Sequence, residues 1–314
     1  MSAIMRLPRS WTQLSVSERR EALAGYLFIS PWLVGFVVFF FGPIVASFVL
    51  SFTRWNIVGS PQWVGLSNYE RIFTQDPFFR KAVTVTLKYA AIYLPLEVIF
   101  GILIAVVLNQ KLRGIGVFRT MYYMPYIVPK VASSLVWVWV LNPRYGLLNT
   151  ILGWFGIQGP SWLADPDWVL PSIVMMALWG VGGSAVIYLA GLQNVPTQLY
   201  EAAAVDGANR FQQFVRITLP MLTPTIFFQL VLGLIGTFQT FTPAFIAAGR
   251  SGGPLQSGLF YMLYIYNRSF ESMRMGYGAA LAWIMTVFIL ILTVLVFRSS
   301  KYWVYYEAER KRTR

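Results

Sequence analysis

The chain contains uncharged apolar stretches longer than a buried helix of a water-soluble protein requires. Residues 22–53 form 32 consecutive positions without a charged side chain, whereas about 20 residues of helix cross roughly 30 Å of hydrocarbon. Only 12% of the 314 residues are charged, and the mean hydropathy is +0.58. A soluble protein of this length needs more charge on its surface. The sequence therefore predicts a polytopic membrane protein.

The distribution of apolar stretches predicts an all-α bundle of six membrane-spanning helices. Two of the stretches contain charged residues away from their ends: Lys88 and Glu97 in one, Lys130 in the other. The predicted spans lie at residues 24–52, 82–109, 117–141, 168–194, 219–248 and 276–298. They make a transmembrane domain of residues 22–298, between an N-terminal arm (1–21) and a basic tail (299–314). In the arm, Ser15-x-x-Glu18 has the spacing of a capping box and predicts a short amphipathic helix on the inner leaflet, with Trp11 and Leu14 as its buried face.

The cations predict which ends of the spans face the cytoplasm. Fifteen Lys and Arg residues lie in the arm, the gap at 109–119, the loop before the fifth span and the tail, against eight in the opposite loops. Cytoplasmic loops carry the excess of cations in membrane proteins. Both termini and the loop at 197–217 are therefore predicted to be cytoplasmic.

The loop at 197–217 is a polar, Ala-rich segment between two long apolar spans. Good helix formers follow Thr197, a possible N-cap, and Asp206-Gly207 is a turn sequence. A second short helix is expected from Asn209 to Arg216, at a right angle to the first, and Leu219-Pro220 would open the fifth span. Read alone, the segment could be an ordinary polar connector.

The loop contains Glu201-Ala202-Ala203, then Gly207, and ends in Ile217-x-Leu219-Pro220. These motifs match the signature loop of ATP-binding-cassette (ABC) importer permeases, and the chain resembles their carbohydrate group, which includes maltose and glycerol-3-phosphate permease subunits. Further matching pieces are Leu192-Gln193-x-Val195-Pro196, Asn142-Pro143-x-Tyr145-Gly146, Gly252-Gly253-Pro254 and Gly276-Tyr277-Gly278. Where many members carry Phe-Asp in the fifth span, this chain has Phe241-Thr242, so the solute stays open among a sugar, an oligosaccharide, a polyol and glycerol phosphate.

The resemblance implies a bacterial or archaeal cytoplasmic-membrane transporter subunit that works by alternating access. Its expected partners are a homologous second permease, two ABC ATPases, an extracytoplasmic solute-binding protein, membrane lipid and a carbohydrate-like solute. ATP and Mg would be bound by the ATPases, because this chain lacks a Gly-x-x-x-x-Gly-Lys-Ser/Thr loop. The residues expected to couple to the ATPase are Glu201, Ala202, Ala203, Asp206 and Gly207. Glu201 would pair with a cation of the ATPase, or with Arg210 or Arg216 of its own loop.

A stripe of small and polar residues in the fifth span is a candidate for the solute path. Gly233, Gly236, Thr237 and Thr240 recur at helical spacing beside Gln239. This pattern is also typical of a seam where two membrane helices pack closely. In similar permeases the corresponding stripe faces the cavity, so the resemblance assigns it to the path together with the turn region at Gly180 and Gly183.

Two other function classes are compatible with particular residues. Asp165-x-Asp167 has the spacing with which some glycosyltransferases hold a divalent metal, although it also reads as the acidic start of a helix. Glu97 could carry protons in a proton-coupled carrier, but the chain has no His, so a proton relay would depend on this one acidic residue. Because the chain also has no Cys, it has no thiolate or imidazole ligands for a metal site. Nucleic-acid binding is not expected, because the cations form no continuous patch. Glu97 and Lys130 are expected to face a partner helix or a cavity, and Lys88 to reach the membrane surface.

Overall fold

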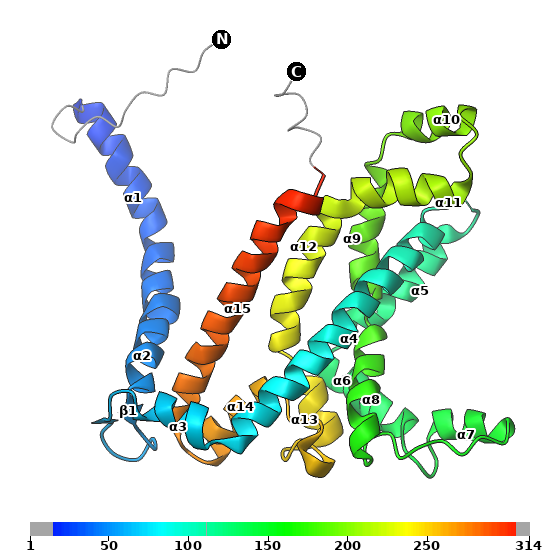
Figure 1. Ribbon diagram of the computed structural model, residues 1–314. Coiled ribbons are helices and arrows are strands. Elements are labelled where there is room, and N and C mark those ends of the chain that lie inside the picture. The colour runs from blue at the N-terminus through cyan, green and yellow to red at the C-terminus, as the bar shows by residue number, and fades with distance from the viewer. Residues whose placement is uncertain (1–14, 111, 306–314) are drawn as a thin grey trace.

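The computed structural model describes residues 15–110 and 112–305 as a set of long, tilted helices joined at both ends by short ones (Figure 1). The first helical rod consists of α1 (Val16–Phe36), the π-helical turn η2 (Val37–Phe41) and α2 (Gly42–Ser51). It is followed by a two-stranded antiparallel hairpin of β1 (Thr53–Arg54) and β2 (Gln62–Trp63), and then by α3 (Ser67–Gln75).

The predicted capping box begins the first rod itself. The Ser15 hydroxyl accepts from the Glu18 N–H, and the Glu18 carboxylate accepts from the Ser15 N–H. Residues 16–21, expected in a separate amphipathic helix, are therefore the first turns of α1. Trp11 and Leu14 lie outside the described residues.

The long helix α4 (Pro77–Leu108) lies diagonally across the molecule in Figure 1 and contacts α8, α9, α12 and α14. Asp76 caps its first turn, where the carboxylate accepts from the N–H groups of Phe78 and Phe79. Gly101 lets α4 approach α9, because a Cβ at this position would lie 2.8 Å from Cε2 of Tyr188.

Two of the predicted spans are broken. The stretch predicted at 117–141 is divided into α5 (Ile115–Ile127) and α6 (Lys130–Val140). Val128 precedes Pro129 and has the extended backbone that a following proline favours, which ends α5. The stretch predicted at 168–194 forms α8 (Pro166–Leu178) and α9 (Gly182–Gln193), whose axes differ by 49°. Between these pairs α7 (Leu147–Trp154) lies apart from the long helices (Figure 1).

The last third of the described chain forms two long helices joined by short ones. α11 (Arg210–Gln213), η3 (Phe214–Thr218) and α12 (Leu219–Phe238) follow one another directly. The stretch predicted as the fifth span, at 219–248, is likewise not one continuous helix. α12 ends at Phe238, and a separate α13 (Thr242–Ala248) starts with Pro243 in its first turn. After η4 (Pro254–Gln256), α14 (Tyr261–Tyr266) and η5 (Asn267–Glu271), α15 (Met275–Trp303) returns to the end where α12 began.

The described helices include four that are long and apolar enough to cross a membrane singly, and α8 with α9 would make a fifth. The single helices are those of Val16–Ser51, Pro77–Leu108, Arg210–Phe238 and Met275–Trp303. The chain is thus mostly helical with several membrane-span candidates, and the stretch predicted as the third span is interrupted at Pro129.

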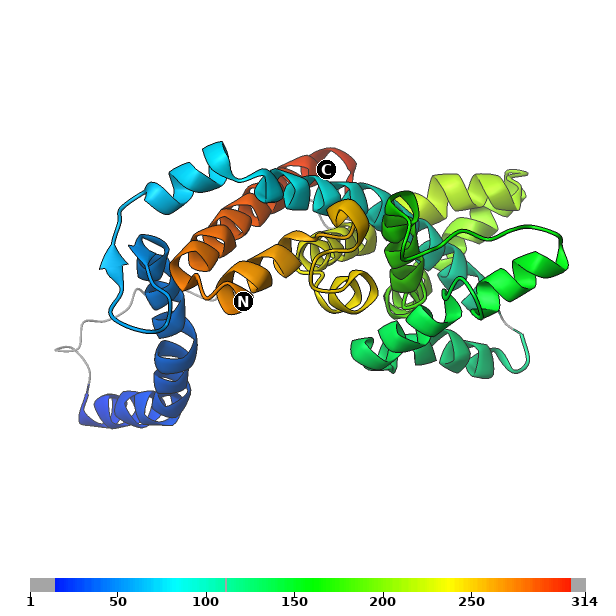
Figure 2. The same ribbon diagram turned by 90° about the horizontal axis from the view of Figure 1, so that it is seen from below.

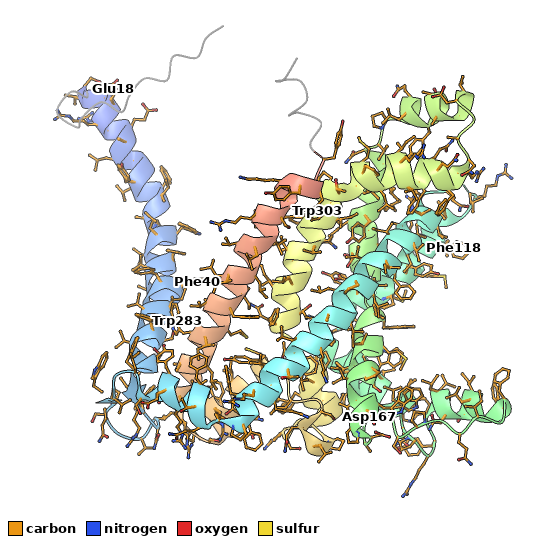
Figure 3. The ribbon with its side chains drawn as sticks, viewed as in Figure 1. Glu18, Phe40, Phe118, Asp167, Trp283 and Trp303 are labelled. Atoms are coloured by element: carbon orange, nitrogen blue, oxygen red, sulfur yellow. The ribbon has the colours of Figure 1, made fainter. Side chains whose placement is uncertain are left out.

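The two ends of the bundle carry different elements. Glu18 and Trp303 lie at the end near α10 and α11, whereas Asp167 lies at the opposite end (Figure 3). The largest buried cluster is formed by α4, α8, α14 and α15, with Phe260, Leu263 and Leu281 fully buried. Seen from below, α1 and α7 occupy opposite edges of the molecule (Figure 2). No residue of α1 is buried in the described part of the chain.

Candidate functional site

The signature segment forms a helical hairpin at one end of the bundle. α10 (Thr197–Val205) lies above α11 in Figure 1, and their connection contains Gly207. The N-cap of α10 is Pro196, not Thr197, and no side chain bonds at this cap. Proline sets the extended backbone before the first turn, so Thr197 is the first helical residue.

Gly207 closes α10 in the left-handed conformation. Its φ is +78°, and the Ala208 N–H donates to the Ala203 carbonyl at 2.9 Å, as in a Schellman motif. An added Cβ at Gly207 would meet no atom within 4 Å. Glycine is therefore favoured at this turn for its backbone conformation and not for space.

The second half of the hairpin is continuous with α12. Asn209 and Gln212 form a reciprocal capping box that starts α11. The expected separate helix from Asn209 to Arg216 is wrong, because the π-helical turn η3 connects α11 to α12 without a break. The hydroxyls of Tyr200 and Thr218 lie 2.9 Å apart and tie α10 to the start of this long helix.

The hairpin exposes most residues of the signature motif on the surface of the protein. Glu201, Ala202 and Asp206 are exposed, and Ala203 is half-buried. Glu201 forms no ion pair with Arg210, Arg216 or any other residue that the structure describes. Two large apolar side chains beside the turn are also exposed, Val205 (90% exposed) and Phe211 (74%), and neither was predicted from the sequence to belong to this surface. Together these groups make an acidic and apolar surface suited to a protein partner.

A cavity of about 270 Å³ lies between α4, α6, the α8–α9 break and the end of α12. On α4, Tyr89, Tyr93 and Glu97 follow one another at a spacing of four residues and all three line the cavity. The rings of Tyr89 and Tyr93 are stacked, with centroids 5.3 Å apart. Trp137 and Trp179 meet edge to face at the other wall. The cavity thus combines aromatic surfaces with a carboxylate.

Glu97 is held in place by the helices that pack on α4. The Ser184 hydroxyl of α9 donates to its carboxylate at 2.5 Å. A Cβ on Gly233 of α12 would lie 3.0 Å from Oε2 of Glu97, so glycine at this position admits the carboxylate. The expectation that Glu97 and Lys130 face a cavity or partner helix is confirmed, since both line this cavity. Lys88 is exposed and does not line it.

Of the residues predicted for the solute path, all but Gly183 line this cavity: Gly180, Gly233, Gly236, Thr237, Gln239 and Thr240. Gly183 instead faces α5, where a Cβ would lie 2.5 Å from the Tyr126 ring. The small-residue stripe combines close packing with open space, because Gly233 packs on α4 while a Cβ on Gly236 would meet no atom within 4 Å. Thr237 is buried, and its hydroxyl donates to the Gly233 carbonyl at 2.6 Å. Tyr89 and Tyr93 were not predicted for this cavity, although they lie eight and four residues before Glu97, a spacing that places all three on one face of a helix.

The acidic pair near α8 is a helix cap. The Asp165 carboxylate accepts from the Asp167 N–H at 2.9 Å, and Pro166 follows it as the first helical residue. Among the described residues no group of three His, Cys, Asp or Glu side chains could hold a metal ion. The interpretation of Asp165 and Asp167 as the acidic start of a helix is confirmed.

Comparison with known proteins agrees with the motifs. Residues 97–304 match the family model of the binding-protein-dependent transport system inner membrane component. The chain is 42% identical over 299 residues to the probable ABC transporter permease protein YesP of Bacillus subtilis, covering 95% of this chain and 96% of the relative. It is 32% identical to the trehalose/maltose transport system permease protein MalF of Thermococcus litoralis, covering 90% and 95%.

A solved structure has the same fold. A chain of a bacterial alginate ABC transporter, in complex with alginate pentasaccharide-bound periplasmic protein, superposes with a TM-score of 0.79 at 25% identity, covering 90% of this chain and 95% of that one. The relatives are transporter permeases and not enzymes. Taken with the signature hairpin at one end of the bundle and the cavity within it, these matches show that the chain belongs to the family of binding-protein-dependent transport system inner membrane components.

Proposed function

We propose that the chain forms half of the translocation path of an ATP-driven importer for a carbohydrate. Its relatives include a permease named for trehalose and maltose, and its fold matches a chain of an alginate transporter. The expected partners are a second permease, two ABC ATPases and a solute-binding protein outside the cytoplasm. ATP and Mg would be held by the ATPases.

The hairpin of α10 and α11 is the proposed contact with the ATPase. Its exposed Glu201 lacks an ion-pair partner in the described chain, which favours a cation on the ATPase over Arg210 or Arg216. Because η3 joins α11 directly to α12, a displacement of the hairpin would be passed to the helix that carries Gly233, Gly236 and Thr240. The hairpin would thus couple ATP-driven closure to alternating access in the cavity.

The cavity of Tyr89, Tyr93 and Glu97 is the proposed solute path. The types of residue that line it are the observation that best supports a carbohydrate as the solute. A sugar presents hydroxyl groups that are costly to bury without hydrogen-bond partners. Aromatic walls with a few polar groups, such as Glu97, Gln239 and Thr240, provide both apolar contact and partners.

The membrane topology that accompanies this function is six spans with both termini and the hairpin in the cytoplasm. The third span would consist of α5 and α6, which continue in the same stretch of chain on either side of Pro129. The fourth would consist of α8 and α9. Non-helical backbone within a membrane is tolerated where it lines a cavity, and Gly180 at the α8–α9 break does so.

Charge reversal of Glu201 tests the coupling role. Glu201→Lys should abolish solute uptake and solute-stimulated ATP hydrolysis by the assembled importer, while the amount of inserted protein stays unchanged. Gln198→Lys is the control, because Gln198 is exposed on the same helix and the variant introduces the same lysine side chain without removing an acidic group. Uptake that is unaffected by Glu201→Lys, or abolished equally by Gln198→Lys, would contradict the assignment.

Single cysteines test the proposed orientation, since the natural chain contains none. Phe211→Cys in the hairpin should react with a membrane-impermeant maleimide only in inverted vesicles. Gln158→Cys, exposed in the loop between α7 and α8, should react only in intact spheroplasts. Labelling of Phe211→Cys from outside the spheroplasts would place the hairpin away from the ATPases and overturn the proposal.

A further inference from the structure

A second cavity, at the end of the molecule opposite α10, brings three arginines together. Arg54 of β1, Arg71 of α3 and Arg274 at the start of α15 line one cavity of about 250 Å³. Trp55 and Tyr277 also line it. We refer to it as the arginine cavity.

The arginine cavity is built on a rigid backbone frame. The Asn68 amide donates to the carbonyls of Ser51 and Thr53, which holds α3 against the end of α2. The N–H of Met275, next to Arg274, donates to the Trp55 carbonyl at 2.9 Å. The three elements that carry the arginines are therefore joined before any ligand binds, and all three arginines line one space.

The three positive charges have no carboxylate partner in the described chain. All three arginines are exposed, and none forms an ion pair with a described residue. Asp76 cannot serve them directly, because its carboxylate is buried and accepts from the hydroxyls of Tyr264 and Tyr277. Like charges around one cavity repel each other unless an anion lies between them. The cavity therefore has the charge of an anion site.

The surroundings of the arginine cavity match the headgroup region of a bilayer. Arg54 and Trp55 come directly after the apolar rod that ends at Ser51, and a cation next to an aromatic residue is typical of the membrane interface. The adjoining hairpin and loop expose large apolar side chains: Val58 is 92% exposed, Trp63 68% and Leu66 67%. Such side chains are stable where they dip among lipid headgroups and acyl chains.

We propose that the arginine cavity binds the phosphodiester of an anionic phospholipid in the leaflet on the side away from the Glu201 hairpin. A guanidinium group donates two parallel hydrogen bonds to phosphate oxygens, and three of them around one space select phosphate over a neutral headgroup. The exposed apolar side chains at its border favour a lipid over an acidic side chain of a soluble protein, because they would contact the acyl chains of the same molecule.

Retention of phosphatidylglycerol by the purified full-length protein tests this site. Protein in nanodiscs of phosphatidylcholine with a minor fraction of phosphatidylglycerol is extracted in mild detergent, and retained lipid is counted by native mass spectrometry. Each cation near an anionic lipid contributes about fivefold to its binding, so the triple variant Arg54→Gln, Arg71→Gln, Arg274→Gln should retain phosphatidylglycerol about a hundredfold more weakly. Retention of phosphatidylcholine should not change.

A matched triple variant separates a site from a general charge effect. Arg80→Gln, Lys81→Gln, Arg144→Gln removes the same charge from exposed residues at the same end of the molecule, outside the cavity. It should retain phosphatidylglycerol like the natural protein. Equal loss in both triples would overturn the site. Displacement of the lipid by an excess of inorganic phosphate would identify a soluble anion as the ligand. Normal lipid retention with lost docking of the solute-binding protein would identify a protein carboxylate instead.

Should the triple glutamine variant insert poorly, the triple lysine variant keeps the test decisive. Arg54→Lys, Arg71→Lys, Arg274→Lys preserves the charge but loses the paired hydrogen bonds to phosphate. Retention of phosphatidylglycerol should still fall at least severalfold if the cavity holds the phosphodiester. Unchanged retention in this variant would contradict the proposed binding mode.

Discussion

The Ser184 hydroxyl of α9 donates a hydrogen bond to the Glu97 carboxylate of α4 at 2.5 Å, inside the cavity proposed as the solute path. The same carboxylate lies against Gly233 of α12. One acidic group is thus held at the meeting point of three helices, with one of its edges open to the cavity. In the proposed solute path, this arrangement makes Glu97 a positioned hydrogen-bond acceptor for the hydroxyl groups of a solute.

Replacement of Glu97 is therefore expected to weaken solute recognition. A hydrogen bond to a charged group contributes about 1.5 to 3 kcal/mol, so Glu97→Ala should raise the KM for uptake by about tenfold to a hundredfold. Glu97→Gln keeps an acceptor oxygen and should have a smaller effect, and Ser184→Ala should have the smallest, since it removes only the group that orients Glu97. Uptake kinetics in cells with matched protein levels measure this order, and an unchanged KM for Glu97→Ala would exclude the residue from the path.

Thr240 and Thr237 are expected to differ, although both were predicted to contact the solute. Thr237 is buried, and its hydroxyl donates a hydrogen bond of 2.6 Å to the Gly233 carbonyl. The hydrogen bond from the Thr240 hydroxyl to the Gly236 carbonyl is long, at 3.4 Å. The double variant Thr237→Val, Thr240→Val should lower uptake without lowering expression, and Thr240→Val alone should account for most of the loss. Equal losses from the two single variants would show that the threonines act through helix packing.

The sequence was sufficient to predict the helical class, the positions of most long helices and the hairpin, because apolar runs and turn residues are local signals. Six of the seven residues that the sequence predicted for the solute path line the cavity, since Gly233, Gly236, Thr237 and Thr240 share one face of a regular helix. Gly183 does not line the cavity itself and packs against α5, because the direction in which it faces depends on the 49° bend between α8 and α9. A bend between helices is set by tertiary contacts, and the periodicity of a single segment does not contain it.

The helix ends were predicted less well than the helices. Helix α12 ends at Phe238, ten residues before the predicted end of the fifth span. The apolar residues that follow form a separate helix, α13, with Pro243 in its first turn. Tyr89 and Tyr93 were not predicted as cavity residues, because aromatic residues are common in membrane spans. Their spacing places them on one face of α4, but the packing of the other helices determines that this face lines a cavity.

Gly207 is expected to tolerate only residues that adopt the left-handed conformation. Its φ is +78° and its surroundings are open, so the cost of a substitution comes from the backbone alone. Gly207→Asn should therefore retain most of the uptake, whereas the β-branched Gly207→Val should lose most of it by disrupting the end of α10. Solute-stimulated ATP hydrolysis of the assembled importer measures both variants. Equal activity of the two would show that the hairpin does not need this turn.

Asp76 is expected to make stability depend on pH in the acidic range. Burial alone would raise the pKa of this carboxyl, but hydrogen bonds from Tyr264, Tyr277 and the Phe79 N–H, with the nearby Arg268, lower the pKa below its ordinary value of 3.8. A lowered folded-state pKa contributes stability above pH 3.8, which is lost as the pH falls through the folded-state pKa. Asp76→Asn should lower the apparent melting temperature in detergent at neutral pH and near pH 4. The difference from the natural protein should shrink only below pH 3.8, and a difference that already disappears near pH 5 would contradict the lowered pKa.

Two glycines near the α8–α9 break give a matched test of the packing that shapes the cavity. A Cβ on Gly182 would lie 1.8 Å from the backbone oxygen of Tyr122, whereas a Cβ on Gly180 would meet only the Ala177 oxygen at 3.5 Å, an ordinary contact. Because a backbone atom cannot rotate away, Gly182→Ala must push α9 from α5, and overpacking of this kind costs about 1 to 3 kcal/mol. Gly182→Ala should therefore lower the apparent melting temperature of the purified protein by several degrees and reduce its yield, while Gly180→Ala should leave both unchanged. Equal apparent melting temperatures of the two variants would show that α5 and α9 are not in the close contact that forms this wall of the cavity.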